Sequence, residues 1–300
     1  MRRQCCSSFT SHVIALFALM LLGQGCTGPA LQMYPAGNQE TAATLAAFSQ
    51  YRQKTEAECV CCIDAEADVT LSVSGWFSDR TGKISGYLQA RKPGFIKFIA
   101  VNPLGQPLFI FTTDGKMFKS LDVFGEKAYL GSVHSETYEK FAPTGFEPEN
   151  SFYWLTGRLG SGEVRIGQVM RSENPETYWL EIIHADSDST SMVLFDPEEM
   201  VILRHVLLDP GGRHLIDLRY AGYQFLPGNR GTVPAGESAA PSLPAAGGYQ
   251  CRVPKLITAS SKGGDRQIEI ELHAFLDDVH FSAADFHVEI PSHFEHLLVR

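Results

Sequence analysis

Short segments in which apolar and polar residues alternate recur along most of this chain, with glycine, proline and asparagine between them. In residues 69–74, valine and leucine alternate with threonine and serine, which is the period of a strand with one solvated face. Asp114-Gly115, between two such segments, predicts a type I′ hairpin turn. Further segments of this kind cover residues 83–91, 95–101, 107–112, 116–122, 127–131, 177–184, 191–195, 201–208, 215–223, 253–259, 267–277 and 286–290. Their order predicts an antiparallel meander.

Three stretches have helical spacing instead. Residues 38–54 place Leu45, Phe48 and Tyr51 three or four positions apart, and residues 136–141 and 148–158 predict two helices in the middle of the meander. We therefore expect a mainly β chain with inserted helices, folded as a strongly curved antiparallel half-barrel of about eleven strands that covers the central helices. A sheet wrapped over helices forms an apolar trough suited to an acyl chain.

The turn between residues 101 and 107 has a defined local chemistry. In Asn102-Pro103-Leu104-Gly105, the proline fixes its φ angle and the glycine permits a positive one. Such a tight turn directs Leu104 outward. The alternative is a turn whose leucine folds back onto the core.

The first 26 residues have the order of an exported lipoprotein precursor. Arg2 and Arg3 precede an apolar run of about ten residues, well short of the roughly 20 that a membrane-spanning helix needs, and small residues lead to Cys26. We expect residues 1–25 to be a cleaved signal peptide, Cys26 to carry the lipid, and residues 26–44 to tether it to a domain at 45–300. The alternative is an ordinary secreted protein that is cut nearby.

Four further cysteines, Cys59, Cys61, Cys62 and Cys251, lie in the exported part of the chain. In an oxidising compartment they favour disulfides, and a disulfide that involves Cys251, free or mixed thiols, and a thiophilic metal all remain open. A second Cys or His pair at zinc-site spacing is missing, which weakens the metal reading.

Composition and motifs give little support for catalysis or for nucleic-acid binding. The net charge of −9 disfavours nucleic acid as a partner. The sequence has no G-x-S-x-G nucleophile elbow, and His293-x-x-His296 could bind a metal only if that segment were helical. We expect no catalytic residue, no cofactor and no metal site.

Two segments carry a resemblance to a known family. The strands and turn in F-I-K-F-I-A-V-N-P-L-G-Q-P-L-F-I-F (95–111) and the central helix S-F-Y-W-L-T-G (151–157) resemble the LolB family, outer-membrane lipoproteins that receive lipoproteins from the periplasmic carrier LolA. The resemblance covers about residues 45–300. It implies that Leu104 is exposed and helps to place cargo in the membrane. The cysteine cluster and extra length in the second half depart from the family pattern.

The resemblance implies a monomeric receptor, lipid-anchored at the periplasmic face of the outer membrane, that is not an enzyme. Its partners would be a LolA-type carrier and the acyl chains of lipoproteins. The apolar trough would be lined by side chains of the strands and central helix: Trp76, Phe98, Phe109, Phe111, Trp154 and Leu155. The alternatives are a lipid- or ligand-binding lipoprotein of the same fold without a role in sorting, and an exported hydrolase or metalloenzyme.

Overall fold

The computed structural model describes residues 31–59, 61–74, 80–135, 138, 148–160, 162–185, 190–226, 251–261, 264, 266–276 and 279–299. The chain divides into two units, Met1–Gln32 and Met33–Arg300, and the second is described below. The expected signal peptide, Cys26, Trp76 and most of the helix expected at 136–141 lie outside the described residues. In the described part of the chain, no helix combines the length and apolarity that a membrane span requires.

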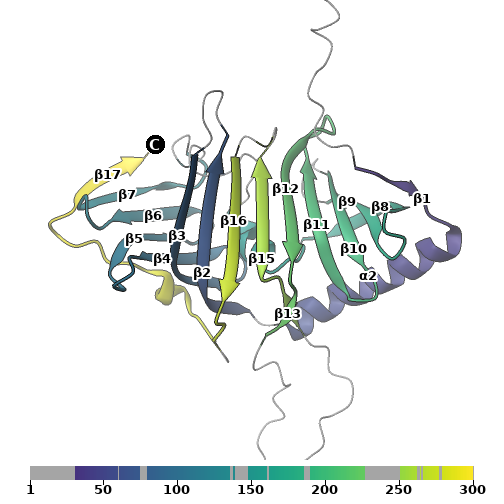
Figure 1. Cartoon of the computed structure of the whole chain (residues 1–300), viewed down its shortest axis with the longest axis horizontal. Helices are drawn as coiled ribbons and strands as arrows, with labels where there is room; N and C mark the ends of the chain where they lie inside the picture. The colour runs from purple at the N-terminus through teal and green to yellow at the C-terminus, as the bar shows by residue number, and fades with distance from the viewer. Residues whose placement is uncertain are drawn as a thin grey trace, which may run out of the picture. The chain divides into compact units, whose positions relative to one another are not determined.

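One sheet of 15 strands dominates the second unit, in the order β1-β8-β9-β10-β11-β12-β15-β16-β2-β3-β4-β5-β6-β7-β17, while β13 and β14 pair separately (Figure 1). The strands are β1 (Tyr34–Pro35), β2 (Cys62–Val73), β3 (Arg80–Arg91), β4 (Phe95–Val101), β5 (Pro107–Thr113), β6 (Met117–Asp122), β7 (Lys127–Ser132), β8 (Val164–Arg171), β9 (Tyr178–His184), β10 (Thr190–Asp196), β11 (Val201–Leu208), β12 (His214–Ala221), β13 (Gln224–Phe225), β14 (Arg252–Val253), β15 (Leu256–Ser261), β16 (Arg266–His273) and β17 (Glu295–Val299). Neighbouring strands are antiparallel except β17, which runs parallel to β7.

The expected mainly β fold with a curved antiparallel sheet is confirmed, but the expected count of about eleven strands is wrong. Strand β8 was missed because a register shift between Ile166 and Val169 interrupts its alternation. Strands β1, β13 and β14 have two residues each, too few to show a period. The hairpin at Asp114-Gly115 is confirmed, but its turn is not type I′, because only the glycine has a positive φ.

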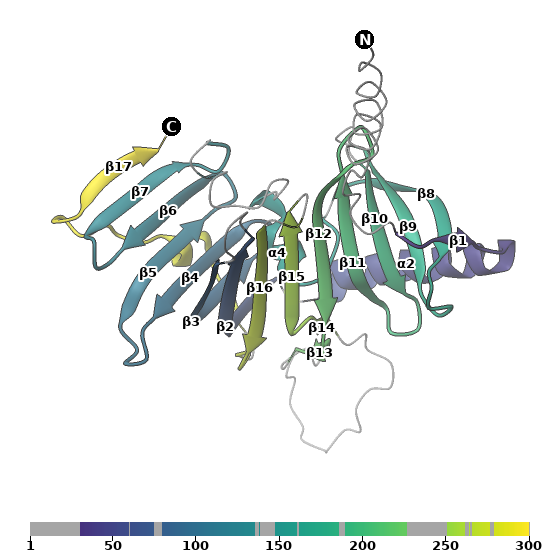
Figure 2. The same ribbon diagram turned by 45° about the horizontal axis from the view of Figure 1, so that its top comes forward.

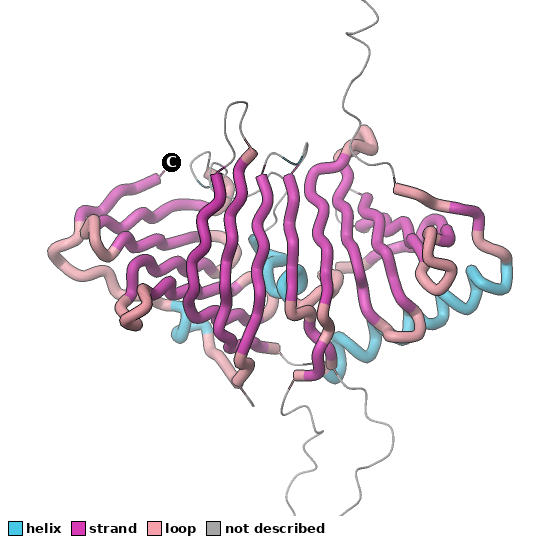
Figure 3. The backbone as a smooth tube through the Cα atoms, in the orientation of Figure 1, coloured by secondary structure: helices cyan, strands magenta, loops and turns pink. Residues whose placement is uncertain are grey.

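Two helices of the described part of the chain lie against one face of the sheet, which we call the helix-bearing face (Figure 3). Helix α2 (Asn38–Glu58) buries Thr44, Phe48, Tyr51 and Thr55, which are spaced three or four residues apart. The second expected helix is shorter than the sequence indicates, because a 3-10 turn, η1 (Pro148–Asn150), precedes the five-residue helix α4 (Ser151–Leu155). All five residues of α4 are buried.

The sheet changes direction between β3 and β4, so that β4 to β7 run across the direction of β2 and β3 (Figures 1 and 2). Gly86 of β3 lies opposite Ala100 of β4, which is next to a register shift in the pairing of β4 with β5. A Cβ atom at Gly86 would lie 2.2 Å from the carbonyl oxygen of Ile99. Glycine is therefore required at this position, where the backbones of β3 and β4 approach closely. The bend divides the helix-bearing face into two parts, one on each side of it.

A strand expected at residues 286–290 is absent. The chain there forms a 3-10 helix, η3 (Ala283–Phe286), and then crosses the opposite face of the sheet, where Val288 and Ile290 pack against Leu121. Apolar and polar residues alternate in this segment because one of its sides contacts the sheet, although the segment itself pairs with no strand. Side chains of three neighbouring strands donate hydrogen bonds to its carbonyl groups: Lys97 to Asp285, Thr112 to Phe286 and Lys119 to Val288.

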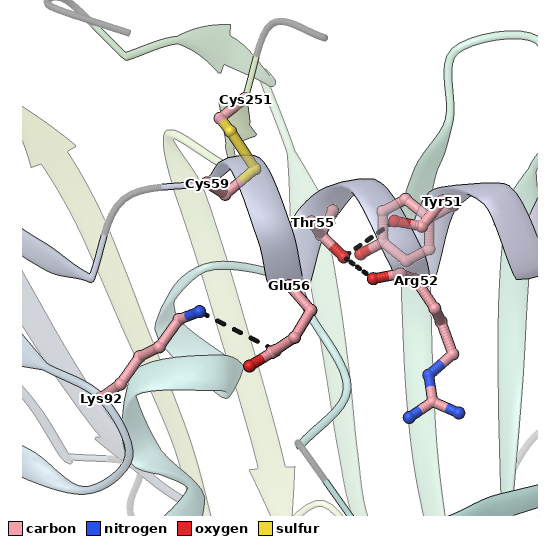
Figure 4. Close-up of a disulfide and its surroundings, with 7 residues drawn as sticks. All are labelled: Tyr51, Arg52, Thr55, Glu56, Cys59, Lys92 and Cys251. Carbon is pink, nitrogen blue, oxygen red and sulfur yellow. Dashed lines mark hydrogen bonds and ion pairs between the residues drawn. A yellow bond between two sulfur atoms is a disulfide. The ribbon is translucent and has the colours of Figure 1, made fainter. Parts of the chain in front are cut away.

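Cys59, Cys61, Cys62 and Cys251 form two disulfides, which resolves the alternatives that the sequence left open. Cys59, at the end of α2, is bonded to Cys251, which precedes β14, across 192 residues of sequence (Figure 4). The adjacent Cys61 and Cys62 are bonded to each other. The first bridge fixes the end of α2 to a distant part of the chain.

Candidate lipid-binding site

A cavity of about 320 Å³ lies between helix α4 and the helix-bearing face of the sheet. Its described lining is almost entirely aliphatic and aromatic: Val69, Leu88, Ile96, Phe98, Phe111, Thr113, Tyr138, Ser151, Trp154, Leu155, Leu218, Ile257, Ala259, Ile268 and Ile270. Its size falls at the lower end of the range for small-molecule pockets, roughly 300–1,000 Å³. A lining of this kind suits a hydrocarbon chain.

The few polar groups of the lining are already engaged or neutral. Thr113 donates its hydroxyl hydrogen to the carbonyl of Met117, and Ser151 donates to the carbonyl of Pro148. Burial, with a smaller contribution from Glu149, raises the pKa of Tyr138 to about 12, so its phenol is neutral at physiological pH. These groups leave the cavity without a formal charge in its described lining.

Strand β2 shows how the cavity opens. Its residues on the helix-bearing face become more exposed along the strand: Ile63, Ala65 and Ala67 are 2% exposed, whereas Leu71 is 44% exposed. The early residues pack against the same cluster as α2 and α4. Leu71 lies directly opposite the cavity residue Ile268 on β16, so the apolar surface continues from the cavity along β2 toward solvent.

The structure brings together four of the six residues expected in the trough. Phe98, Phe111, Trp154 and Leu155 line the cavity, whereas Phe109 lies on the same face of β5 beyond it. Trp76 lies outside the described residues. Sequence reasoning missed the lining residues of β12, β15 and β16, although Ile257 and Ala259, like Ile268 and Ile270, are two positions apart and share a face. The roles of all these residues in binding remain predictions.

The turn between β4 and β5 presents Leu104 to solvent with 84% of its surface exposed. The side-chain oxygen of Asn102 accepts hydrogen bonds from the backbone nitrogens of Leu104 (2.9 Å) and Gln106 (3.0 Å). Gly105 has a φ of 78° and donates its N–H to the carbonyl of Asn102, while Pro103 occupies the position between Asn102 and Leu104. The alternative in which Leu104 folds onto the core is therefore wrong.

One titratable residue is buried in the same face, next to the cavity wall. His205 of β11 lies opposite Leu218 and is 4% exposed, and among the described residues neither ring nitrogen has a hydrogen-bond partner. Burial, with a smaller effect of His184, lowers the pKa of His205 from 6.5 to about 3. The imidazole is therefore neutral throughout the physiological range.

We expect His205 to make the protein less stable in mild acid. When the pH falls below 6.5 the unfolded chain takes up a proton at this residue, while the folded chain does not until about pH 3. Its contribution to the free energy of unfolding should fall by about 2 kcal/mol between pH 7 and pH 5. Urea unfolding at the two pH values should show a smaller difference for His205→Leu than for the parent.

His214→Leu, at the more exposed start of β12, is the control for this measurement. It should retain the parent's difference between pH 7 and pH 5. An unchanged difference in His205→Leu would show that His205 does not stay neutral in the folded state.

A group of potential metal ligands lies on the opposite face of the sheet. Ligand atoms of Asp68, Glu271 and His273 lie within 4.8 Å of one another. The Nζ atoms of Lys83 and Lys255 lie 2.9 Å from Asp68 and 3.5 Å from Glu271, so both carboxylates are already balanced. A hydrogen bond from Ser85, with the neighbouring Lys83, lowers the pKa of Asp68. The group is therefore a network of ion pairs that extends across β3, β2 and β16 to the bend before β15.

The other late histidines do not have the geometry that their spacing could provide. His296 belongs to strand β17 and His293 lies in the turn before it, so His293-x-x-His296 is not helical. This removes the one condition under which the pair was considered a metal site.

No family model and no curated protein matches the chain. Among solved structures, a DUF1329 family protein from Desulfovibrio piger is similar, with 10% identity over 81% of this chain and 96% of that chain and a TM-score of 0.51. A domain described as an outer membrane lipoprotein-sorting protein from Vibrio parahaemolyticus has 13% identity over 81% and 95% (TM-score 0.47). A LolA superfamily protein from Nitrosomonas europaea has 8% identity over 83% and 98% (TM-score 0.48).

The likeness to the Desulfovibrio protein is one of fold and extends over nearly the whole of that protein. The architecture expected from the sequence, a curved antiparallel sheet with helices on one face, is confirmed. Identities of 8–13% concern the fold alone.

Proposed function

We propose that this chain is a lipoprotein receptor, lipid-anchored through Cys26 at the periplasmic face of the outer membrane, that holds acyl chains and passes them to the bilayer without catalysis. The observation that carries the proposal is the apolar cavity of about 320 Å³ between α4 and the sheet. Its continuation along β2 to the half-exposed Leu71 supplies a path by which a chain enters from solvent.

Hydrocarbon burial is sufficient to drive both capture and release. Each buried methylene contributes about 0.8 kcal/mol, so ten methylenes contribute roughly 8 kcal/mol before the cost of ordering the chain. A bilayer buries every methylene of the same chain, including those that a cavity of this size leaves outside. Transfer from the protein to the membrane is then downhill and needs no energy source.

The sorting role rests on the N-P-L-G turn, which resembles the LolB family, and on the exposure of its leucine. A LolA-type carrier is the partner that this role requires. The cavity supports the second candidate, a lipid-binding lipoprotein without a role in sorting, as well as it supports the sorting role. The second candidate, however, assigns no role to Leu104.

One experiment tests the proposal and separates the two candidates. Native mass spectrometry of the purified protein should detect bound lipid, and mixing with a lipoprotein-loaded LolA-type carrier should transfer the lipoprotein to this chain. Bound lipid without transfer would favour the second candidate. A protein that neither carries lipid nor binds a fluorescent fatty acid would refute both.

We expect Leu104→Glu to impair delivery without affecting the fold. Because Leu104 is 84% exposed, its replacement should change the melting temperature by no more than a few degrees. A carboxylate at this position cannot enter the apolar part of the bilayer, so release of cargo into liposomes should slow at least tenfold while acceptance of cargo is retained.

Leu298→Glu is a matched control, because Leu298 lies on β17 and is 82% exposed. It introduces the same chemical change on an equally exposed leucine and should leave release unchanged. Equal release rates for Leu104→Glu and the parent would contradict the delivery role of the turn.

A further inference from the structure

A second apolar side chain projects from the turn next to the one that carries Leu104. Phe124, between β6 and β7, is 72% exposed. Since β4 to β7 are consecutive antiparallel strands, their β4–β5 and β6–β7 turns lie at the same end of the ladder, on the same side in both views (Figures 1 and 2). A single exposed apolar residue is common in soluble proteins, but two on adjacent turns form a pattern.

The two turns are held together and each is fixed internally. The backbone nitrogen of Val123 donates a hydrogen bond of 3.1 Å to the carbonyl of Leu108, which follows the first turn. Within the second turn, Asp122 accepts a hydrogen bond of 2.9 Å from the backbone nitrogen of Gly125. A Cβ atom at Gly125 would lie 2.5 Å from the Asp122 carboxylate, so a larger residue there would displace this carboxylate from its hydrogen bond. Phe124 thus lies at the tip of a turn whose conformation is fixed by hydrogen bonds.

Charge around the two tips is low. Apart from Leu104, the first turn contains only asparagine, proline, glycine and glutamine. In the second, Asp122 lies directly opposite Lys127, so their charges offset each other at the base of the turn, and the exposed Glu126 carries the one remaining charge. The Leu104 tip can therefore approach a lipid headgroup layer without desolvation of formal charge, and at the Phe124 tip only the Glu126 carboxylate must stay hydrated among the headgroups.

We infer that Leu104 and Phe124 form a two-point contact with the surface of a phospholipid bilayer. This inference rests on the proposed function. It assigns a second residue to the delivery step, and it implies that the end of the sheet that carries both turns faces the bilayer. Each side chain projects from its own turn, so a protein partner would need two separate matched pockets. A fluid apolar phase accepts both side chains as they are.

The test places a reporter at each tip of the full-length, lipidated protein in liposomes of phosphatidylethanolamine and phosphatidylglycerol. Leu104→Trp, Phe124→Trp and the control Phe225→Trp are compared with the parent, using lipids brominated in the upper part of the acyl chain. Phe225 is 52% exposed on β13 and serves as an aromatic position outside the two turns. Additional tryptophan emission at positions 104 and 124 should be quenched by at least about a third, and that at 225 should not.

Quenching at both tips supports the inference, and a two- to threefold slower release of cargo by Phe124→Ser would support it further. Quenching at position 104 alone overturns the two-point contact while leaving the delivery role of Leu104 intact. Quenching at neither tip overturns it as well. Binding of a fluorescent fatty acid to the same samples reports on the cavity separately, so failure of the proposed function is recognised independently.

Discussion

Filling the cavity with a side chain should strongly weaken acyl-chain binding while leaving the fold intact. Ala259 of β15 lines the cavity between Leu218 and Ile268, its direct neighbours on β12 and β16. Ala259→Phe places a phenyl ring in the space that a hydrocarbon chain would occupy. If the ring displaces about four methylenes, the loss is roughly 3 kcal/mol, or on the order of 100-fold in the dissociation constant of a fluorescent fatty acid.

The neighbouring residue provides a matched control. Thr258 is on the same strand but faces the opposite side of the sheet, where it lies between Arg219 and Glu269. Thr258→Phe adds a ring of the same size outside the cavity and should bind fatty acid as the parent does. Thermal unfolding of both variants shows whether either ring disturbs the sheet. Undiminished binding by a folded Ala259→Phe variant would show that the cavity is not the lipid site.

Strand identity could be predicted from the sequence because local alternation reflects which face of each strand is buried. Val69, Leu71 and Ile268 all lie on the helix-bearing face, as their spacing indicates. The pairing of β16 with β2 joins residues about 200 positions apart, and no local pattern encodes it. The cavity lies across this junction, so its lining from the late strands was not foreseen.

Two features of the structure explain where the sequence misled. One segment packs on the sheet without pairing with a strand, and in one strand a bulge interrupts the alternation of apolar and polar residues. Val288 and Ile290 alternate with polar residues because one side of their segment packs on the sheet. In β8 the opposite occurs: the segment does pair as a strand, but the register shift between Ile166 and Val169 interrupts the alternation by which it would be recognised. His205 could not be distinguished from a solvated histidine, because its burial depends on strands β10 and β12 on either side of it. The turn at Asn102–Gly105 was predictable, since its geometry depends on its own residues.

Removal of the Cys59–Cys251 disulfide should produce the largest loss of stability among these variants. The bridge closes a loop of 192 residues, and the chain-entropy model assigns to such a loop about 5 kcal/mol, at the upper end of what disulfides contribute. It also fixes the end of α2, whose Phe48 and Tyr51 pack in the same core cluster as the walls of the cavity. The double variant Cys59→Ala/Cys251→Ala should melt at least about 10 °C below the parent.

The adjacent pair Cys61–Cys62 distinguishes loop closure from the mere loss of sulfur atoms. Its two residues are consecutive, so the bridge constrains almost none of the unfolded chain. Cys61→Ala/Cys62→Ala removes as many sulfur atoms as the first double variant and should lower the melting temperature by only a few degrees. If both double variants melt equally early, the stabilisation arises from packing around the sulfur atoms. If the variant lacking Cys59 and Cys251 melts with the parent, the attachment of α2 does not depend on the covalent bond, and the core contacts of Phe48 and Tyr51 hold the helix by themselves.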